Sequence, residues 1–316
     1  MRIINALEMS GKTRLAQVME SLNEAFKDLH AREEQSPPRT LLQHGPSEML
    51  ISPAAWMKRG VASVKITTLT QGNSAHGLPL IHGVVVLTDI NTGQILALLD
   101  GAPLTAVRTG AVAGLATHLC APNNAGDLAI IGAGVQARAT LLAMLDVRQI
   151  YRVRIFSRTA ARAAEFARWA STLTAAQVIV CDNACEAVQG AEIICTTTST
   201  SCSEPLIKAD WVTPGAHLNI IGGTHEDAIE VDPVLFKAAF VVVETKAAAQ
   251  EGAGEVRSAL AQGYLQPECL NELGALILGK TALKQKQTTV FRSVGLALED
   301  TAAALAIYQS TDTLTC

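Results

Sequence analysis

The stretch DLAIIGAGVQA, residues 127–137, decides the fold of this 316-residue chain. It begins as a short apolar run, typical of a strand buried on both faces, and ends in a GxGxxA turn before a helix-forming segment. Gly132 and Gly134 let the backbone turn and approach a pyrophosphate, and Ala137 is the permitted small third residue. The first N–H groups of the helix, from Val135 and Gln136 on, would bind the phosphates. The pattern therefore predicts dinucleotide binding; the alternative is tight strand–helix packing without a ligand.

Further short apolar runs follow this stretch, and helical segments separate most of them. They cover residues 152–158, 176–182, 192–199, 216–223 and 239–245. Strands that are buried on both faces and alternate with helices are typical of a parallel sheet. We therefore expect an α/β fold with a doubly wound parallel sheet of the Rossmann type.

The N-terminal part has a different pattern. Residues 8–33 and 104–120 have helical spacing, and residues 34–60 contain four prolines and suggest a loop with short strands. Strands are expected at 63–70, 81–89 and 94–101, and the last two are joined by a tight hairpin. Hairpins imply an antiparallel sheet, so we predict a second α+β domain. A cleft between two such domains is a common place for a small ligand.

The composition excludes several classes of protein. Hydrophobic residues make up 49% of the chain, charged residues 17%, and the net charge is −4. There is no basic field for nucleic acid or an anionic membrane, no secretory signal, and no apolar run long enough to span a bilayer. The seven cysteines form no CxxC pair and show no metal-ligand spacing with histidine. We expect reduced thiols in the cytoplasm and no metal site.

The residues at the end of the second predicted strand indicate which dinucleotide binds. Many dinucleotide-binding folds have an acidic residue here, which holds the ribose hydroxyls. This chain has Ser157, Arg158 and Thr159, and no Asp or Glu from residue 147 to 164. Two hydroxyls and a guanidinium suit a 2′-phosphate, so we predict NADPH, with NADH as the alternative if Arg158 is only a solvated surface charge.

The next candidate cofactor contacts follow the strand at 192–199. Three consecutive threonines end this strand, at the edge of the sheet where ligands sit, and alternation allows Thr196 and Thr198 to face the same ligand. They are candidates for contact with the pyrophosphate or the nicotinamide.

Several segments in order carry a resemblance to a known family. They are SVKI (63–66), LTAVRT (104–109), IIGAGVQA (130–137), FSRT (156–159), TPGAHLNIIGG (213–223) and TTVFRSVGLALEDTAAALAIY (288–308). The sequence resembles the ornithine cyclodeaminase/mu-crystallin family over nearly its whole length, and its ketimine reductase branch in particular. The resemblance implies a homodimer built on the N-terminal strands. It also implies a last helix that folds back, so that one domain comprises residues 1–118 with 292–316 and the other residues 119–291.

The resemblance also assigns substrate residues. It implies that Arg39, Lys65 and Arg108 hold the substrate carboxylate, which suits a bidentate guanidinium beside a lysine point charge. Lys65 could instead be an edge-strand lysine that deters aggregation, whereas Arg108 lies in an apolar helical stretch and needs a partner. His44 is a further substrate candidate. Arg108 and Ser293 are further cofactor candidates.

One position departs from the pattern of the ornithine cyclodeaminases, which carry an Asp after the Gly-Gly of the fifth strand. Here the matching residue is Thr224. Threonine is a poor general base, so the departure argues against deamination and for imine reduction, with Thr224 and Lys65 as the catalytic residues. A shift of register could bring His225, Glu226 or Asp227 to the place of the missing acid.

The predicted function is therefore NAD(P)H-dependent reduction of a cyclic ketimine carboxylate. Δ1-Pyrroline-2-carboxylate, giving L-proline, is the first candidate, and the six-membered Δ1-piperideine-2-carboxylate, giving L-pipecolate, is the second. The alternatives are an alanine dehydrogenase-like amino acid dehydrogenase, an ornithine cyclodeaminase, and a non-catalytic NADPH-dependent binding protein.

Overall fold

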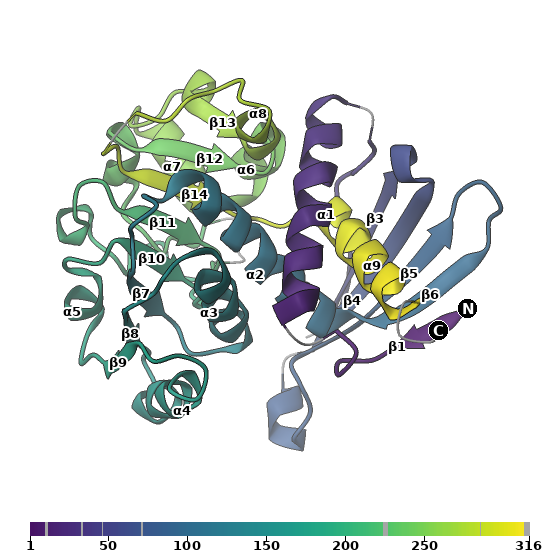
Figure 1. Ribbon diagram of the computed structural model, residues 1–316, viewed down its shortest axis with the longest axis horizontal. Coiled ribbons are helices and arrows are strands. Elements are labelled where there is room, and N and C mark those ends of the chain that lie inside the picture. The colour runs from purple at the N-terminus through teal and green to yellow at the C-terminus, as the bar shows by residue number, and fades with distance from the viewer. Residues whose placement is uncertain are drawn as a thin grey trace. The chain divides into compact units, whose positions relative to one another are not determined.

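The computed structural model describes residues 1–9, 12–32, 34–45, 47–70, 72–223, 227–284 and 286–312 (Figure 1). The chain divides into two compact units. The first unit comprises Met1–Ala111 with Gly295–Cys316, and the second comprises Val112–Val294. One division falls inside helix α2 (Gly101–Cys120), and the other lies between strand β14 (Thr289–Arg292) and helix α9 (Ala297–Asp312).

The second unit is built on an eight-stranded sheet in which every pair is parallel. In spatial order the strands are β13 (Leu270–Glu272), β12 (Phe240–Val243), β14, β11 (His217–Ile220), β10 (Ile193–Thr196), β7 (Asp127–Ile131), β8 (Arg152–Phe156) and β9 (Gln177–Val180). The helices of this unit are α3 (Val135–Val147), α4 (Ala160–Ala170), α5 (Ala184–Val188), α6 (Lys246–Gly252), α7 (Gly254–Ala261) and α8 (Leu273–Ile277). The expected parallel Rossmann-type sheet is confirmed.

The strand order places the ligand edge of this sheet. The chain runs from β7 through β8 to β9 on one side, then returns to place β10 on the other side of β7. Ligands bind outside the carboxyl ends of parallel strands at such a reversal. Every residue of β7 and β10 is buried, which explains why these strands are apolar throughout rather than alternating. Strand β14 inserts between β11 and β12, and the apolar runs did not predict it.

The first unit is built on a six-stranded mixed sheet. In spatial order the strands are β1 (Arg2–Ile4), β6 (Ile95–Asp100), β5 (Ile81–Asp89), β4 (Val61–Thr70), β3 (Ser47–Trp56) and β2 (Thr40–His44). Only β1 and β6 pair in parallel. The β5–β6 hairpin lies where the sequence predicted it, since Gly93 adopts φ +72° and its N–H donates to the Asp89 carbonyl over 2.8 Å.

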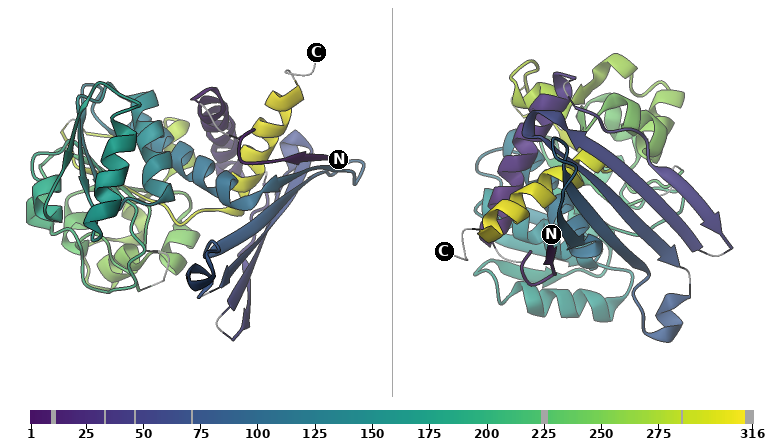
Figure 2. Two further views of the ribbon diagram at one scale, coloured as in Figure 1. Left: turned by 90° about the horizontal axis from the view of Figure 1, so that it is seen from below. Right: turned by 90° about the vertical axis from the view of Figure 1, so that its right-hand side faces the viewer.

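One face of this sheet carries two helices, α1 (Lys12–His30) and α9, which lie side by side (Figure 2). Ser63 of β4 shares a hydrogen bond of 2.8 Å with Thr301 of α9, and Ser21 of α1 donates to the Ala302 carbonyl over 2.8 Å. The strand residues that alternate with those under α1 and α9 point to the opposite face of the sheet. They are half-buried and mostly apolar, and include Val64, Ile66, Val84, Val86 and Leu98.

The proline-rich segment 34–60 is more regular than expected. The prediction of short strands was wrong for β3, which runs for 10 residues and contains Pro53. Strand β2 pairs with β3 only as far as Ile51, while Pro53 faces Val64 on its other neighbour, β4. Proline is tolerated in a strand where its missing N–H has no ladder partner. Among the described helices, none combines the length and apolar character that a bilayer span requires.

Candidate functional site

The glycine turn after β7 has the shape that a pyrophosphate site needs. Gly132 adopts φ +111°, and a Cβ there would lie 2.8 Å from both the carbonyl and hydroxyl oxygens of Thr197. Gly134 is the N-cap of α3, and a Cβ on it would meet no atom within 4 Å, so the backbone faces open space. Ala137 is fully buried against the sheet. The first turn of the 13-residue helix, with Val135 and Gln136, therefore presents N–H groups to an anion, and the turn fits the diphosphate of a dinucleotide.

The arginines after α3 divide into two groups. Arg148 is buried and donates to main-chain carbonyls at the end of α2 and in the turn after it, including those of Thr117 at 2.9 Å and Ala121 at 2.7 Å. Two further arginines, Arg152 and Arg154, bind Asp127. These three contacts are structural.

The loop between β8 and α4 holds the remaining arginine of interest. Arg158 and Thr159 are exposed, Ser157 is half-buried, and Thr159 is the N-cap of α4. Within the described residues neither Arg158 nor Arg162 has an ion-pair partner, in contrast to Arg152 and Arg154. Ser157, Arg158 and Thr159, the predicted binding site for a 2′-phosphate, are thus accessible at the end of β8. The segment contains no carboxylate.

The threonines at the end of β10 have different environments. Thr196 is buried, and its hydroxyl donates to Glu230 over 2.6 Å. Thr198 is half-buried and binds the same glutamate through its hydroxyl at 2.6 Å and its N–H at 2.8 Å. Thr197, which sequence reasoning did not select, donates to the Ile131 carbonyl over 3.2 Å beside the glycine turn. Thr197 and Thr198 therefore reach the ligand edge of this unit, and Thr196 lies beneath it.

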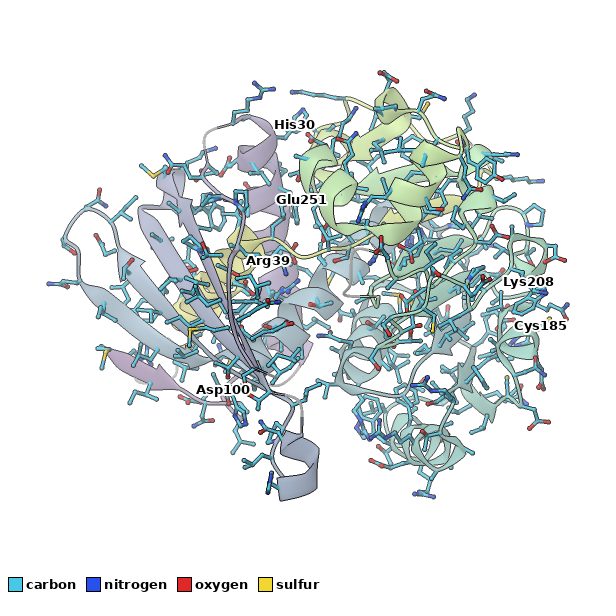
Figure 3. The ribbon with its side chains drawn as sticks, turned by 180° about the vertical axis from the view of Figure 1, so that it is seen from behind. His30, Arg39, Asp100, Cys185, Lys208 and Glu251 are labelled. Carbon is cyan, nitrogen blue, oxygen red and sulfur yellow. The ribbon has the colours of Figure 1, made fainter. Side chains whose placement is uncertain are left out.

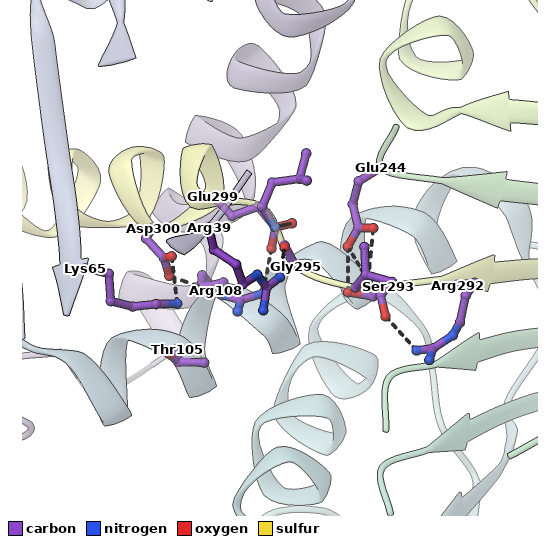
Figure 4. Close-up of polar contacts among 12 residues, drawn as sticks. Arg39, Lys65, Thr105, Arg108, Glu244, Arg292, Ser293, Gly295, Glu299 and Asp300 are labelled. Carbon is purple, nitrogen blue, oxygen red and sulfur yellow. Dashed lines mark hydrogen bonds and ion pairs between the residues drawn. The ribbon is translucent and has the colours of Figure 1, made fainter. Parts of the chain in front are cut away.

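Sequence reasoning also missed a buried ionic network below this edge. The N–H of Glu230 donates to Glu255 over 2.7 Å, and Glu255 pairs with Arg292 at 2.8 Å. The Arg292 guanidinium continues to the Gly223 carbonyl at 2.9 Å. The hydroxyl of Ser293, a predicted cofactor contact, donates to buried Glu244 over 2.7 Å (Figure 4). These acids stand singly in the sequence, so no local pattern identified them as partners of Arg292, Ser293 or the threonines.

The first unit brings together the three predicted substrate cations (Figure 4). Lys65 of β4 contacts Asp300 at 2.7 Å, and Arg108 of α2 contacts Glu299 at 2.9 Å and Asp300 at 3.3 Å. Arg39, which precedes β2 (Figure 3), donates to the Gly295 carbonyl over 2.9 Å (Figure 4). All three cations therefore meet the segment that opens α9.

The carboxylates of Glu299 and Asp300 were not predicted, although one feature of the sequence indicates them. Glu299 and Asp300 are consecutive acids in the first turn of an otherwise apolar helix, and each side chain is only 1% exposed. The sequence required a partner for Arg108 and did not identify it. Three cations gathered at the start of one helix suit a ligand with a carboxylate.

The electrostatics of the cluster centre on Lys65. Burial lowers the pKa of the Lys65 ammonium, and the charges of Arg108 and Arg39 lower it further, whereas the Asp300 carboxylate opposes them. The three cations are therefore close enough to act on one another. Among the causes, the Asp300 carboxylate is the one that raises the Lys65 pKa.

Some predicted residues lie outside the described part of the chain. Thr224 is one of them, as are His225, Glu226 and the side chain of His44. Asp227 is described, and it lies at the surface with Arg257 3.5 Å away. Gly223, immediately before Thr224, adopts φ +66°, and its carbonyl accepts a hydrogen bond from Arg292.

The parallel sheet with its glycine turn defines a dinucleotide-binding α/β protein. Its other unit carries a cluster of three cations that suits a small carboxylate. The chain belongs to the ornithine cyclodeaminase/mu-crystallin family, whose model matches residues 2–313.

Three relatives illustrate the similarity. The ketimine reductase mu-crystallin of Mus musculus is 36% identical over 260 residues, which cover 82% of this chain and 79% of the relative. A Δ1-pyrroline-2-carboxylate reductase of Bacillus cereus (strain ZK / E33L) is 33% identical over 315 residues, 98% of this chain and 96% of the relative. The solved structure of Thermococcus litoralis Δ1-pyrroline-2-carboxylate reductase in complex with NADH and L-proline is 28% identical, with a TM-score of 0.92 over 99% of this chain and 98% of that chain.

Proposed function

We propose that this protein is an NADPH-dependent ketimine reductase that converts Δ1-pyrroline-2-carboxylate to L-proline, with the six-membered homologue as the second candidate substrate. The observation that carries the proposal is the cluster of Arg39, Lys65 and Arg108, in which Glu299 and Asp300 hold Lys65 and Arg108 and the Gly295 carbonyl holds Arg39. It supports binding of one carboxylate in a chain that aligns almost end to end with a reductase of that name.

The cluster supports separate roles for its residues in binding the substrate and in donating a proton. The guanidinium of Arg108, oriented by Glu299 and Asp300, offers two parallel N–H groups to the substrate carboxylate, and Arg39 adds a second fork. Bound reduced nicotinamide supplies a hydride to the carbon of the C=N bond. The nitrogen gains one proton, for which Thr224 and the Lys65 ammonium are the candidate donors. Holding the imine in one orientation supplies most of the catalysis.

The lowered pKa of Lys65 favours it as the proton donor. Burial makes its ammonium a stronger acid than a solvated lysine, while the Asp300 carboxylate, at 2.7 Å, acts in the opposite direction. A proton donor works best when its pKa lies near the operating pH. The carboxylate of the substrate would then be drawn to the same ammonium that protonates its nitrogen.

NADPH is the proposed cofactor because the end of β8 offers a guanidinium and hydroxyls. Arg158 is exposed and has no ion-pair partner among the described residues, so nothing there competes with a 2′-phosphate. The nearest carboxylate in sequence after it, Glu165, binds Arg138 at 2.7 Å.

A substrate panel followed at 340 nm tests the function. The expected result is NADPH oxidation with five- or six-membered cyclic imine carboxylates and none with pyruvate plus ammonia. Ammonia-dependent turnover of pyruvate would point to an amino acid dehydrogenase, and conversion of ornithine without net oxidation of cofactor to a cyclodeaminase. Nucleotide binding without any imine turnover would overturn the enzyme proposal in favour of a binding protein.

We also propose a homodimer that forms on the open face of the first unit's sheet. Half-buried Val64, Val84 and Val86 on that face support it, because a contiguous apolar surface of this kind marks an interaction site. Light scattering should give twice the 33.3 kDa chain mass. Val86→Lys should yield the monomer, and Lys208→Glu, at an exposed position in the other unit, should not. A monomeric wild-type protein would contradict the proposal. A cytoplasmic location remains a prediction.

A further inference from the structure

We infer that Thr198, held by Glu230, accepts a hydrogen bond from the carboxamide N–H of the nicotinamide, and that Glu230 is the positioning residue that makes this threonine an acceptor. The inference rests on the proposed use of a nicotinamide cofactor. It places Thr198 at the nicotinamide of that cofactor rather than at the diphosphate.

The direction of the Thr198 hydroxyl follows from its contacts. The Thr198 N–H donates to Glu230 Oε1 over 2.8 Å, so this oxygen is an acceptor, and the Thr198 hydroxyl lies 2.6 Å from the same atom. The other oxygen, Oε2, faces Thr196 at 2.6 Å. A proton on the glutamate would therefore sit on Oε2, and in either protonation state the Thr198 hydroxyl donates to Oε1.

The arrangement is rigid because Glu230 is tied into the core. The residue is fully buried, and its own N–H binds Glu255, which is paired with Arg292. Gly222 leaves the space for it, since a Cβ there would lie 2.4 Å from Glu230 Oε1 and 2.2 Å from the Thr198 carbonyl oxygen. The hydroxyl proton of Thr198 thus has one fixed partner, one lone pair of its oxygen accepts the Thr200 N–H over 3.4 Å, and the other lone pair remains for a ligand.

An acceptor cannot serve a phosphate, because phosphate oxygens at neutral pH also only accept. The two threonines divide accordingly. Thr197 lies beside Gly132 on the β7 side, where the diphosphate fits, whereas Thr198 lies beside Gly222 on the β11 side. The proposed 2′-phosphate site at the end of β8 lies on the other side of β7, so a dinucleotide that crosses the glycine turn has its nicotinamide end on the β10–β11 side. At that end of the cofactor the carboxamide nitrogen provides two N–H donors, and Thr198 provides the acceptor that they need.

Equilibrium binding tests the assignment without any turnover. The probes are NADPH and its reduced 3-acetylpyridine analogue, in which a methyl group replaces the carboxamide nitrogen. Both are titrated by nucleotide fluorescence against the wild type, Thr198→Val, Thr198→Ser and Glu230→Gln. 2′-Phospho-ADP-ribose, which has the diphosphate and no nicotinamide, is the control ligand.

Thr198→Val should weaken NADPH binding about five- to tenfold, the effect of one lost hydrogen bond, and leave the analogue within about twofold. Thr198→Ser should restore the preference for NADPH. Glu230→Gln should keep the same preference, because its carbonyl oxygen can take the place of Oε1 toward the Thr198 N–H and hydroxyl while its NH2 group faces the Thr196 hydroxyl.

Three results would overturn the inference. The first is an equal loss for NADPH and the analogue in Thr198→Val, and the second is a loss for 2′-phospho-ADP-ribose, which would place Thr198 at the diphosphate. The third is a wild-type protein that binds no nucleotide, which would also remove the cofactor proposal. Failure of imine turnover with intact nucleotide binding would refute the proposed reaction and leave the Thr198 assignment standing.

Discussion

Replacing Asp300 with asparagine should move the alkaline limb of the pH profile. Asp300 lies 2.7 Å from the Lys65 ammonium and is the charge that opposes the lowering of the Lys65 pKa by burial and by the two arginines. Asp300→Asn removes that charge with little change of shape. The Lys65 pKa should then fall further, so that the lysine loses its proton at lower pH.

The magnitude follows from the burial of the pair. Lys65 is 12% exposed and Asp300 is 1% exposed, so water screens their attraction weakly. An opposite charge in contact shifts a pKa by about 1–3 units, and we expect the alkaline limb of kcat/KM to move down by that amount. The free energy of unfolding should also fall by about 3–5 kcal/mol, because Lys65 and Arg108 lose a buried counter-charge.

Glu299→Gln is the matched control. Glu299 is the adjacent residue, is equally buried, and also binds Arg108, whose guanidinium does not titrate in the accessible pH range. It should cost similar stability and leave the alkaline limb in place. The assay is kcat/KM for a cyclic imine from pH 6 to 10 in all three proteins, in which the substrate's own titration is common and cancels. An unmoved limb in Asp300→Asn, or an equal shift in Glu299→Gln, would refute the reasoning.

Three further outcomes are expected. Gly132→Ala should lower both the melting temperature and the NADPH affinity, because the φ of +111° and the close neighbours of Gly132 exclude a Cβ. Gly134→Ala should lower the NADPH affinity and leave the melting temperature unchanged. Calorimetry and fluorescence titration separate the two variants, and equal losses of melting temperature would contradict this prediction. Arg158→Ala should raise the Kd of NADPH about 10- to 100-fold with NADH unchanged, and an equal effect of Arg162→Ala would speak against the assignment. Burial lowers the pKa of His217 to about 3, below the unfolded value of 6.5, so the unfolded state takes up a proton on this histidine first as the pH falls. The free energy of unfolding should therefore fall between pH 6.5 and 3, by up to roughly 4–5 kcal/mol. Urea titrations of His217→Gln at acid pH should lack this loss, and a pH dependence parallel to that of the wild type would refute the prediction.

The elements that the sequence predicted correctly are those set by local patterns. The glycine turn at residues 132–137, the short buried strands, and the hairpin at residues 89–93 all follow from backbone geometry and from the period of the apolar residues. The proline-rich segment shows the limit of such rules. Pro53 is compatible with a long strand only because β2 ends before reaching it, and that depends on a neighbour rather than on the proline.

For the contacts of Lys65, Arg108 and the threonines in the candidate site, the sequence predicted one partner, the cation or the threonine, and not the acid that it binds. The sequence identified Arg39, Lys65 and Arg108, because cations in strands and apolar helices stand out and the family resemblance gave them roles. It did not identify Glu299 and Asp300, since their partners lie roughly 200 residues or more away in the chain. In the same way, the threonine run was recognised and its partner Glu230 was not.

The sequence by itself thus determined the class of fold, the position of the phosphate turn and the absence of an acid at the end of β8, each of which depends on residues that are adjacent in the chain. Only the tertiary structure decided that β14 enters the middle of the parallel sheet, that α9 supplies the counter-charges of the cationic cluster, and that Thr198 presents a lone pair rather than a proton. These features depend on which distant segments pack together. Buried charges and hydroxyls take whatever partner the fold brings within about 3 Å, and no local pattern encodes that partner.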